Sequence, residues 1–544
     1  MKSKSISRRD FLRTAGVGTA VLFTGGTFAN LLSGCSLAEE AVRPAATLQS
    51  TPLRSSPANL TGLEIALSAI EDRVDILPGG ATPVWRYQGE VLKGAASVLQ
   101  TLPGSYLGPV LRLRRGQQVR VQFNNALIDP SIIHWHGLHL PEDMDGHPRY
   151  AVPAGQNYTY EFTVNNRAGT YWFHPHPHQL TGPQVYYGLA GLFLVSDEEE
   201  DEAGLPIGEY DIPLVIQDRT FDADNRLVYL PNGMMDQMNG FLGDRILVNG
   251  KPDFTLPVEA GVYRLRLLNG SNSRVYKLAW EDGLPLVVIA TDGGLLEKPI
   301  KRDYVTLGPG ERIELWADFS ERRLGSDMRL VSLPFTAGGG GMMGGMMGGM
   351  GGMMGNSGAL PNGARFEVLR VRIEKKASER HLLPEKLSTI SRYQLKDSVN
   401  ARKPRNFDLF MQQMTGTING RRFQMDAVAD DEVVRLNDLE VWQFANLGGG
   451  MGMMGGGSLP HPMHIHGVQF QVLERQVEQA FRSEYRTVSA GFVDEGWKDT
   501  VLVMPGERVR VLIKFDDYTG LYLYHCHNLE HEDAGMMRNY RVKA

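Results

Sequence analysis

The sequence predicts an all-β protein built from three β-sandwich units. Short runs such as "NYTYEFTV" and "ERVRVLIKF" alternate apolar and polar residues, and Gly, Pro, Asn and Asp turn signals separate them at intervals of about ten residues. Long amphipathic helical patterns are scarce. Similar phrases recur at 111–125, 262–274 and 433–447, which indicates one structural unit present three times.

The N-terminal residues 1–35 have the features of an export signal. "SRRDFLR" contains twin arginines, Arg8 and Arg9, and the apolar run "AGVGTAVLFTGGTFANLL" follows it, which is typical of a Tat signal. The next phrase, "LSGC", resembles a bacterial lipobox, in which the cysteine, here Cys35, is lipidated and anchors the mature protein to the membrane. Cleavage nearby with loss of Cys35 is the alternative. Either outcome predicts a periplasmic or otherwise extracytoplasmic protein.

The remaining chain divides by composition. We expect a polar tether at 36–60 and a charged, Pro-containing connector at 377–404. The three sandwich units are predicted at 61–200, 207–376 and 405–544. Two Met/Gly runs interrupt the strand pattern: 338–358, with seven methionines, and 448–457, with three. Such runs cannot form a packed core and are predicted to be loops.

Composition narrows the range of functions. The chain has 544 residues, 42% hydrophobic and 22% charged, enough for several globular domains with sizeable cores. Its formal net charge of -6 gives no basic face and argues against a nucleic-acid partner. Only two cysteines are present, and with Cys35 lipidated or removed Cys526 stands alone. A disulfide framework is therefore excluded, and Cys526 must have another role.

Most of the 14 histidines lie in four short phrases, "HWHG", "HPHPH", "HPMHIHG" and "YHCHNLEH". Each contains His-x-His, and residues two apart on a strand project to the same face, so each pair can offer two imidazoles to one locus. The pairs are His134/His136, His174/His176, His464/His466 and His525/His527. Because no histidine lies between His178 and His381, the middle unit cannot hold an imidazole-ligated metal. Eight imidazoles exceed the needs of one ion, and imidazole alone does not identify the metal.

Cys526 indicates a second site. It lies between two histidines of one strand, so its side chain points to the opposite face. His461, His531 and Met536 are unassigned side chains that could join it, and one thiolate, two imidazoles and a weak axial thioether form the ligand set of a blue-copper electron-transfer centre. The alternative, a small buried core cysteine, leaves those neighbours unexplained. One strand would thus join an electron-accepting site to a histidine cluster at which O2 could be reduced.

These phrases resemble those of the multicopper oxidases over nearly the whole mature chain. "TGPQVYYGLAG", "GFLGDRILVNG" and "HPMHIHGVQFQVL" are similar to the three-domain bacterial copper-efflux oxidases and laccase-like members in particular. The resemblance implies an all-β fold of three cupredoxin-like Greek-key domains. It also implies four copper ions, one type 1, one type 2 and two type 3, with O2 and a small reducing substrate as reaction partners.

The resemblance also implies roles for individual residues. The type 1 ligands would be His461, Cys526, His531 and Met536, and the type 2 ligands His134 and His464. The type 3 pair would be held by His136, His174, His176, His466, His525 and His527. Asp145 and Glu532 stand where the family keeps acids near the cluster, and carboxylates there could relay protons to reduced oxygen. His178 is expected to play a supporting or structural role, and His139, His147 and His381 are expected at the surface.

The methionines bear on the substrate. Thioether sulfur is a soft ligand that selects Cu(I), so the Met runs favour Cu(I) oxidation in copper detoxification. Met451, Met453 and Met454 precede His461, and Met411 and Met414 in "FMQQM" resemble a substrate-binding stretch of the copper-efflux enzymes. The longer run lies within the second unit, however, and Gly and Thr replace the expected acidic partners.

Several alternatives remain open. A laccase oxidising phenols would have the same four centres, and Fe(II) and Mn(II) are further candidate substrates. The non-enzyme alternatives are a copper-storage protein and a copper-free structural factor, the latter disfavoured by the intact ligand phrases. A two-domain nitrite reductase is disfavoured by the third unit. A monomer is expected.

Overall fold

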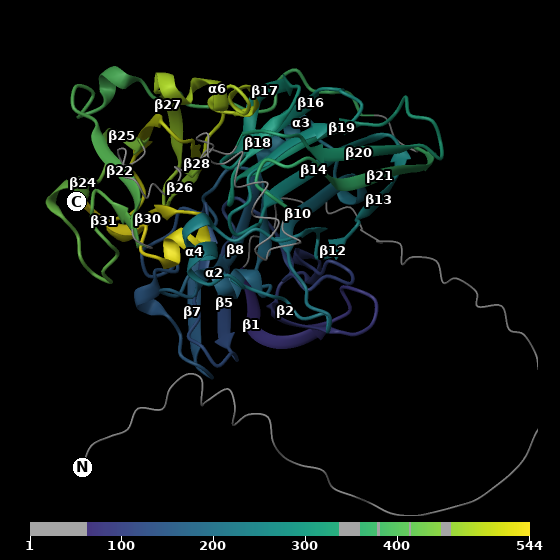
Figure 1. The fold of residues 1–544 in the computed structure, drawn as a ribbon, viewed down its shortest axis with the longest axis horizontal. Coiled ribbons are helices and arrows are strands. Elements are labelled where there is room, and N and C mark those ends of the chain that lie inside the picture. Colours follow the sequence, from purple (N-terminus) through teal and green to yellow (C-terminus); the bar gives the residue numbers. More distant parts are fainter. Residues whose placement is uncertain (1–61, 337–359, 378–380, 413–414, 448–458) are drawn as a thin grey trace, which may run out of the picture. The chain divides into compact units, whose positions relative to one another are not determined.

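The computed structural model describes residues 62–544 apart from 337–359, 378–380, 413–414 and 448–458. In the described part, β-strands alternate with turns, and the helices are short (Figure 1). The strands form six sheets that fall into three consecutive pairs along the chain. The expected signal segment, tether and longer Met/Gly run, and nearly all of the shorter run, lie outside the described residues.

The first sandwich contains strands β1 to β9. Its sheets have the orders β2-β1-β5-β7 and β3-β4-β9-β8-β6. Along the first eight residues of β1, buried apolar positions alternate with half-buried ones, so one face of that strand lies on a core that includes Trp135, Phe173 and Phe193. The bounds are β1 (Leu63–Val74), β2 (Thr82–Lys93), β3 (Leu99–Gln100), β4 (Val110–Arg114), β5 (Gln118–Asn125), β6 (Ile133–His136), β7 (Asn157–Thr163), β8 (Gly169–Pro175) and β9 (Gly191–Ser196), with helices α2 (Thr181–Tyr186) and α3 (Glu198–Ala203).

The second sandwich contains strands β10 to β21. Its sheets have the orders β12-β11-β10-β14-β19-β16-β17 and β13-β21-β20-β15-β18, and they enclose a separate core. The bounds are β10 (Asp211–Arg219), β11 (Arg245–Val248), β12 (Lys251–Pro252), β13 (Thr255–Ala260), β14 (Val262–Asn269), β15 (Tyr276–Trp280), β16 (Leu286–Thr291), β17 (Gly294–Arg302), β18 (Val305–Leu307), β19 (Arg312–Asp318), β20 (Asp327–Ser332) and β21 (Phe366–Lys376), with helix α4 (Met234–Asn239).

The third sandwich contains strands β22 to β31. Its sheets have the orders β23-β22-β25-β29-β27 and β24-β31-β30-β26-β28, and β26, β30 and β31 lie side by side (Figure 1). The bounds are β22 (Arg405–Gln412), β23 (Thr415–Ile418), β24 (Val433–Arg435), β25 (Leu439–Asn446), β26 (His461–Ile465), β27 (Phe470–Val477), β28 (Thr500–Val503), β29 (Glu507–Lys514), β30 (Gly520–Cys526) and β31 (Met537–Lys543), with helices α6 (Arg482–Tyr485) and α7 (Leu529–Asp533).

All three sandwiches share one topological feature. Each sheet contains a parallel pair in which the second strand is not the next along the chain, as a Greek-key connection produces. These pairs are β1 with β5, β4 with β9, β10 with β14, β13 with β21, β22 with β25 and β24 with β31. The three recurring phrases supply strands of these pairs. The predicted all-β fold of three cupredoxin-like sandwiches is confirmed.

The segment expected to connect the second and third sandwiches is packed against both. Leu387 is buried and its N–H donates to the carbonyl of Glu297 at 2.9 Å, while the N–H of Tyr393 donates to Gln471 Oε1 at 3.0 Å. Among the described residues, no helix is both long enough and apolar enough to cross a membrane.

Candidate metal centre

Four strands position the histidine pairs. His134 and His136 lie on β6, and His174 lies opposite His134 on the neighbouring strand β8. In the third sandwich β26 and β30 pair so that His464 lies opposite His525. The remaining members directly follow strands: His176 after β8, His466 after β26 and His527 after β30. All eight side chains are buried.

The pairs from the first and third sandwiches meet. His134 Nε2 lies 3.2 Å from His464 Nε2, and His176 Nε2 lies 3.2 Å from His525 Nε2. Within each sandwich, His136 Nδ1 lies 3.4 Å from His174 Nε2, and His466 Nε2 lies 3.1 Å from His525 Nε2. Three groups of three imidazoles result: His134/His136/His464, His136/His174/His527 and His176/His466/His525.

These separations suit shared metal ions. With nitrogen–metal distances of about 2.0–2.1 Å, two imidazoles on one ion have nitrogens about 2.9–3.4 Å apart. Burial lowers the pKa of most of these imidazoles well below 6.5, and it lowers the pKa of His174 to about 3, so the rings are neutral and carry free lone pairs. Within the described chain, neither ring nitrogen of buried His527 has a hydrogen-bond partner. A metal ion would satisfy the lone pair that is otherwise left without a partner.

The outward ring nitrogens are held by acceptors. His134 Nδ1 donates to the carbonyl of Asp145 at 2.6 Å, and His464 Nδ1 donates to the carbonyl of Asp499 at 2.8 Å. His174 Nδ1 donates to the carbonyl of Pro175 at 2.9 Å. An acceptor fixes the proton on the outward nitrogen, so the inward nitrogen presents its lone pair to the shared centre.

In His136 the two ring nitrogens exchange roles, so that Nε2 points outward and Nδ1 points to the cluster. Its Nε2 lies 3.0 Å from Asp499 Oδ1, and its Nδ1 faces His174. No sequence motif predicted that Asp499 takes part in the site. Its phrase, "GWKDTV", contains no histidine, and the contact joins residues 363 positions apart.

A second group lies on the other face of β30. His461 Nδ1 is 3.4 Å from Cys526 Sγ and 3.2 Å from His531 Nδ1, and Cys526 Sγ is 3.9 Å from His531 Nδ1. Met536 is fully buried in the same core as Cys526, and its carbonyl accepts from the Cys526 N–H at 3.0 Å. Burial raises the pKa of the Cys526 thiol and lowers the pKa of His531 to about 4. The strand therefore separates Cys526 from His525 and His527.

Two carboxylates border the histidine cluster. Asp145 Oδ2 accepts from His466 Nδ1 at 2.7 Å, and burial raises the pKa of this carboxyl well above its usual value. Glu532 Oε2 lies 3.1 Å from His525 Nδ1, and its other oxygen lies 3.5 Å from His176 Nε2. Each acid therefore lies beside one imidazole of the first sandwich and one of the third. Asp145 lies beside His134 and His466, and Glu532 lies beside His176 and His525.

Two elements carrying methionine approach the Cys526 group. Met411 on β22 is half-buried and pairs with Gly416 on β23, which packs against Met536. Helix α4 contacts α7, and the carbonyl of Met238 lies 3.1 Å from His531 Nε2. Sequence reasoning missed α4, although "GMMDQM" holds three methionines. Met414, Met451, Met453 and Met454 lie outside the described residues.

Histidines outside the two groups differ partly from expectation. His147 was expected at the surface but is buried, because its Nε2 bonds Asn539 Oδ1 at 2.9 Å across two sandwiches. His178 lies beyond the end of β8 at Pro175, and this exposed ring packs against Phe423. His139 is half-buried against Asp517, and His381 is half-buried beside Tyr210.

Three β-sandwiches, a buried Cys–His group and an adjoining multi-histidine cluster together define a class of protein: cupredoxin-fold metalloproteins with several metal sites. Comparison with known proteins identifies the family. Two family models described as multicopper oxidase match residues 85–200 and 398–544. The chain belongs to the multicopper oxidase family.

Individual relatives agree with this assignment. "Multicopper oxidase mco" of Staphylococcus haemolyticus is 32% identical over 81% of this chain and 83% of the relative. A protein named "Laccase" from Bacillus stratosphericus is 31% identical over 81% of this chain and 90% of the relative. Both relatives therefore match most of their own length.

Solved structures give the same result. The 2F4 variant of McoA multicopper oxidase from Aquifex aeolicus has a TM-score of 0.73 and 36% identity, covering 88% of this chain and 96% of that chain. A multicopper oxidase from Campylobacter jejuni, described as a metallo-oxidase, has a TM-score of 0.67 and 25% identity, covering 91% of this chain and 95% of that one. The protein is thus a copper-dependent oxidoreductase that uses O2 and a reducing substrate.

Proposed function

We propose that this protein is an exported oxidase that removes one electron from each of four Cu(I) ions and reduces O2 to water. The balanced reaction is four Cu(I), one O2 and four protons giving four Cu(II) and two water molecules. The observation that carries the choice of substrate is the contact of methionine-bearing α4 with His531. The metallo-oxidase description of the Campylobacter relative is consistent with it.

We assign four copper sites to the two groups. His461, Cys526, His531 and Met536 would hold the type 1 copper, because one thiolate, two imidazoles and a thioether suit a blue-copper site. His134 and His464 would hold the type 2 copper. The type 3 pair would be held by His136, His174, His176, His466, His525 and His527. When bound, copper would supply the one-electron redox steps and the O2-binding positions that the side chains lack.

The protein's own groups orient ligands and handle protons. Backbone carbonyls and the Asp145 carboxylate fix imidazole tautomers, as described above. Because burial raises its pKa, the Asp145 carboxyl holds a proton more readily than an exposed carboxyl and can donate it beside the cluster. Glu532 borders the cluster at His525 and His176, where it can accept and pass protons.

The substrate surface is argued from α4. Met234 and Met235 are 57% and 61% exposed, so their side chains are accessible to a ligand from solution. Met238 lies one helical turn from Met234 on the same side of α4, and its carbonyl contacts His531. Thioether sulfurs select Cu(I), so this helix would hold the substrate ion next to His531, a proposed ligand of the type 1 copper.

Steady-state oxidation of Cu(I), Fe(II), Mn(II) and a phenol under O2 tests the substrate. Replacing Met234, Met235 and Met238 together by Leu should lower kcat/KM for Cu(I) about tenfold, or about 1.4 kcal/mol, and leave phenol oxidation unchanged. Met328→Leu, in the second-sandwich core, is the control. Equal loss for both substrates would argue against the α4 assignment.

The alternatives predict other outcomes. A laccase, as named among the relatives, would oxidise phenols with a higher kcat/KM than Cu(I) and would tolerate the methionine changes. A copper-storage protein would bind copper but consume no O2 with either donor. Either result would replace the proposed reaction.

We also propose a monomer with the unit boundaries 61–200, 207–376 and 405–544, exported by the Tat signal in 1–35 and anchored through Cys35. Fatty-acid labelling of cells tests the anchor. Labelled wild type and unlabelled Cys35→Ala support it, and an unlabelled wild type refutes it.

A further inference from the structure

The second sandwich contributes no histidine to the cluster, yet one of its side chains reaches the cluster's border. Arg312 begins β19 and is fully buried. Its Nη1 donates to Asp499 Oδ1 at 2.8 Å, and its Nη2 donates to Asp499 Oδ2. The guanidinium therefore grips the third-sandwich carboxylate through both oxygens.

Every remaining guanidinium N–H is also used. Nε donates to the carbonyl of Thr170 on the first sandwich at 3.0 Å. Nη1 also donates to the carbonyl of Gly310 at 2.9 Å, and Nη2 to the carbonyl of Asp292 at 3.0 Å. Five donors thus meet five acceptors, and they come from all three sandwiches. A lysine, with three donors on a single nitrogen, cannot reproduce this fork.

Asp499 contacts two of the proposed copper ligands, one through its carboxylate and one through its backbone carbonyl. Asp499 Oδ1 accepts from His136 Nε2 at 3.0 Å, and the Asp499 carbonyl accepts from His464 Nδ1 at 2.8 Å. A carboxylate and a carbonyl can only accept, so both contacts fix the proton on the outward nitrogen. The inward nitrogens, His136 Nδ1 and His464 Nε2, then face His174 and His134.

The glycine after His136 leaves room for the ion pair between Arg312 and Asp499. Gly137 has φ +90°, and a Cβ at this position would lie 2.5 Å from Asp499 Oδ2 and 2.8 Å from Arg312 Nη2. The last residue of "HWHG" is therefore glycine where the ion pair approaches the backbone. The motif therefore supplies two imidazoles and, through its glycine, the space that Arg312 and Asp499 occupy.

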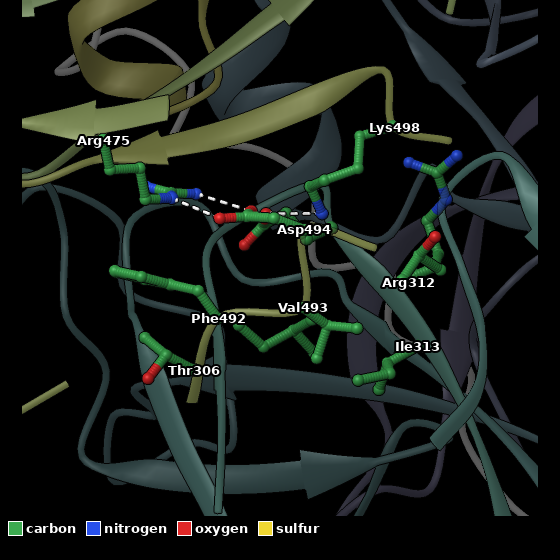
Figure 2. Close-up of a pocket in the computed structure, with 11 residues that line it drawn as sticks. Thr306, Arg312, Ile313, Arg475, Phe492, Val493, Asp494 and Lys498 are labelled. Atoms are coloured by element: carbon green, nitrogen blue, oxygen red, sulfur yellow. Dashed lines mark hydrogen bonds and ion pairs between the residues drawn. The ribbon is translucent and has the colours of Figure 1, made fainter. Parts of the chain in front are cut away.

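Neighbouring charges hold the ion pair in place. Asp292 Oδ1 accepts from the Arg312 backbone N–H at 2.7 Å, and Asp292 Oδ2 lies 3.0 Å from Lys498 Nζ. Lys498 Nζ also lies 2.9 Å from Glu311 Oε1. Figure 2 shows Arg312 and Lys498 among the residues that line a small pocket. These contacts link the second sandwich to Asp499, which directly precedes β28 of the third sandwich.

We propose that Arg312 is a positioning residue for the copper cluster. By holding Asp499 it sets the tautomer and orientation of His136 from the first sandwich and His464 from the third. The domain without copper ligands thereby controls how tightly the other two retain copper. The inference rests on the proposed assignment of His136 and His464 as copper ligands.

The test uses full-length protein reconstituted with copper. The variant is Arg312→Lys, and the matched control is Arg264→Lys, an equally buried arginine of the same sandwich that pairs with Glu314 and Glu200. Copper per chain is measured after dialysis against graded chelator, together with the type 1 blue absorption and the type 2 EPR signal. Loss of an outer partner of a metal-bound histidine typically weakens metal retention about 10- to 100-fold.

We expect Arg312→Lys to lose cluster copper at about 10- to 100-fold lower chelator concentration with altered type 2 hyperfine splitting, and to keep its blue absorption. Arg264→Lys should retain cluster copper like the wild type. Asp499→Asn, which can turn an N–H₂ toward His136, should reproduce the type 2 change and serves if Arg312→Lys fails to fold.

Cluster copper retained within about twofold of wild type, with an unchanged type 2 signal, in a folded Arg312→Lys or Asp499→Asn protein would overturn the positioning role. A wild-type protein that binds copper without any type 2 signal would instead refute the proposed ligand assignment. The two failures are therefore distinguishable.

Discussion

Replacing Gly416 by alanine tests how tightly the hairpin β22–β23 braces the Cys526 group. A Cβ at this buried position would lie 2.6 Å from Met536 Cβ, 2.7 Å from Met536 N and 2.9 Å from the carbonyl of His531. Ordinary contacts begin at 3.4 Å, so Met536 or the hairpin must retreat by about 0.8 Å. Two of the three crowded atoms belong to the backbone and cannot rotate away.

The magnitude follows from overpacking of a well-packed core, which costs about 1–3 kcal/mol. We expect Gly416→Ala to lower the free energy of unfolding by about that amount, and to shift the blue absorption because Met536, a proposed ligand of the type 1 copper, moves relative to Cys526. Denaturant unfolding, followed by tryptophan fluorescence and by the blue band, measures both effects.

Thr417→Ala in the same strand is the control, since Thr417 is only half-buried. It should leave the blue band in place. If Gly416→Ala and Thr417→Ala have the same free energy of unfolding and the same blue band, the hairpin does not brace the Cys526 group.

Four further predictions follow from the site. Cys526→Ser should abolish the blue absorption and substrate oxidation but keep the type 2 EPR signal, because Cys526 lies on the opposite face of β30; loss of both signals would contradict two separate groups. Asp145→Asn should slow O2 reduction about 10²- to 10⁴-fold at constant copper content, measured by oxygen electrode, and unchanged turnover would exclude its proton role. Because burial raises the pKa of Cys526 and keeps it a thiol, copper loading of the copper-free protein at neutral pH should release a proton, detectable in weak buffer and absent in Cys526→Ser. Deleting 338–358 should depress oxidation of Cu(I) more than that of a bulky organic dye; equal effects would argue against a copper role for this run.

Local patterns predicted much of the fold and the site. Alternation along "YHCHN" was enough to place Cys526 apart from His525 and His527, since the side-chain period of a strand is a local property. The three recurring phrases likewise predicted three sandwiches, because each supplies strands with equivalent pairing.

Contacts across the chain could not be predicted in this way. His147 looked like a loop histidine, and its burial comes from Asn539, 392 residues later. Arg312 and Asp499 lie in ordinary strand phrases, and only their meeting over 187 residues gives them a place beside the cluster. Met238 contacts His531 through its backbone carbonyl, whose position no side-chain pattern reveals. Each of these contacts joins segments that are far apart in the sequence, so no local pattern could predict it.

The distance along the chain between facing histidines has a consequence for biogenesis. His176 and His525, whose ring nitrogens lie 3.2 Å apart, are 349 residues apart in sequence. At about 5–20 residues per second, synthesis of that interval takes roughly 20–70 s. Throughout this time a nascent chain holds only the first-sandwich histidines of the cluster, and a chain truncated before β30 lacks His525 and His527 and never completes it. Copper acquisition at the cluster thus reports that the whole polypeptide has been made and has folded.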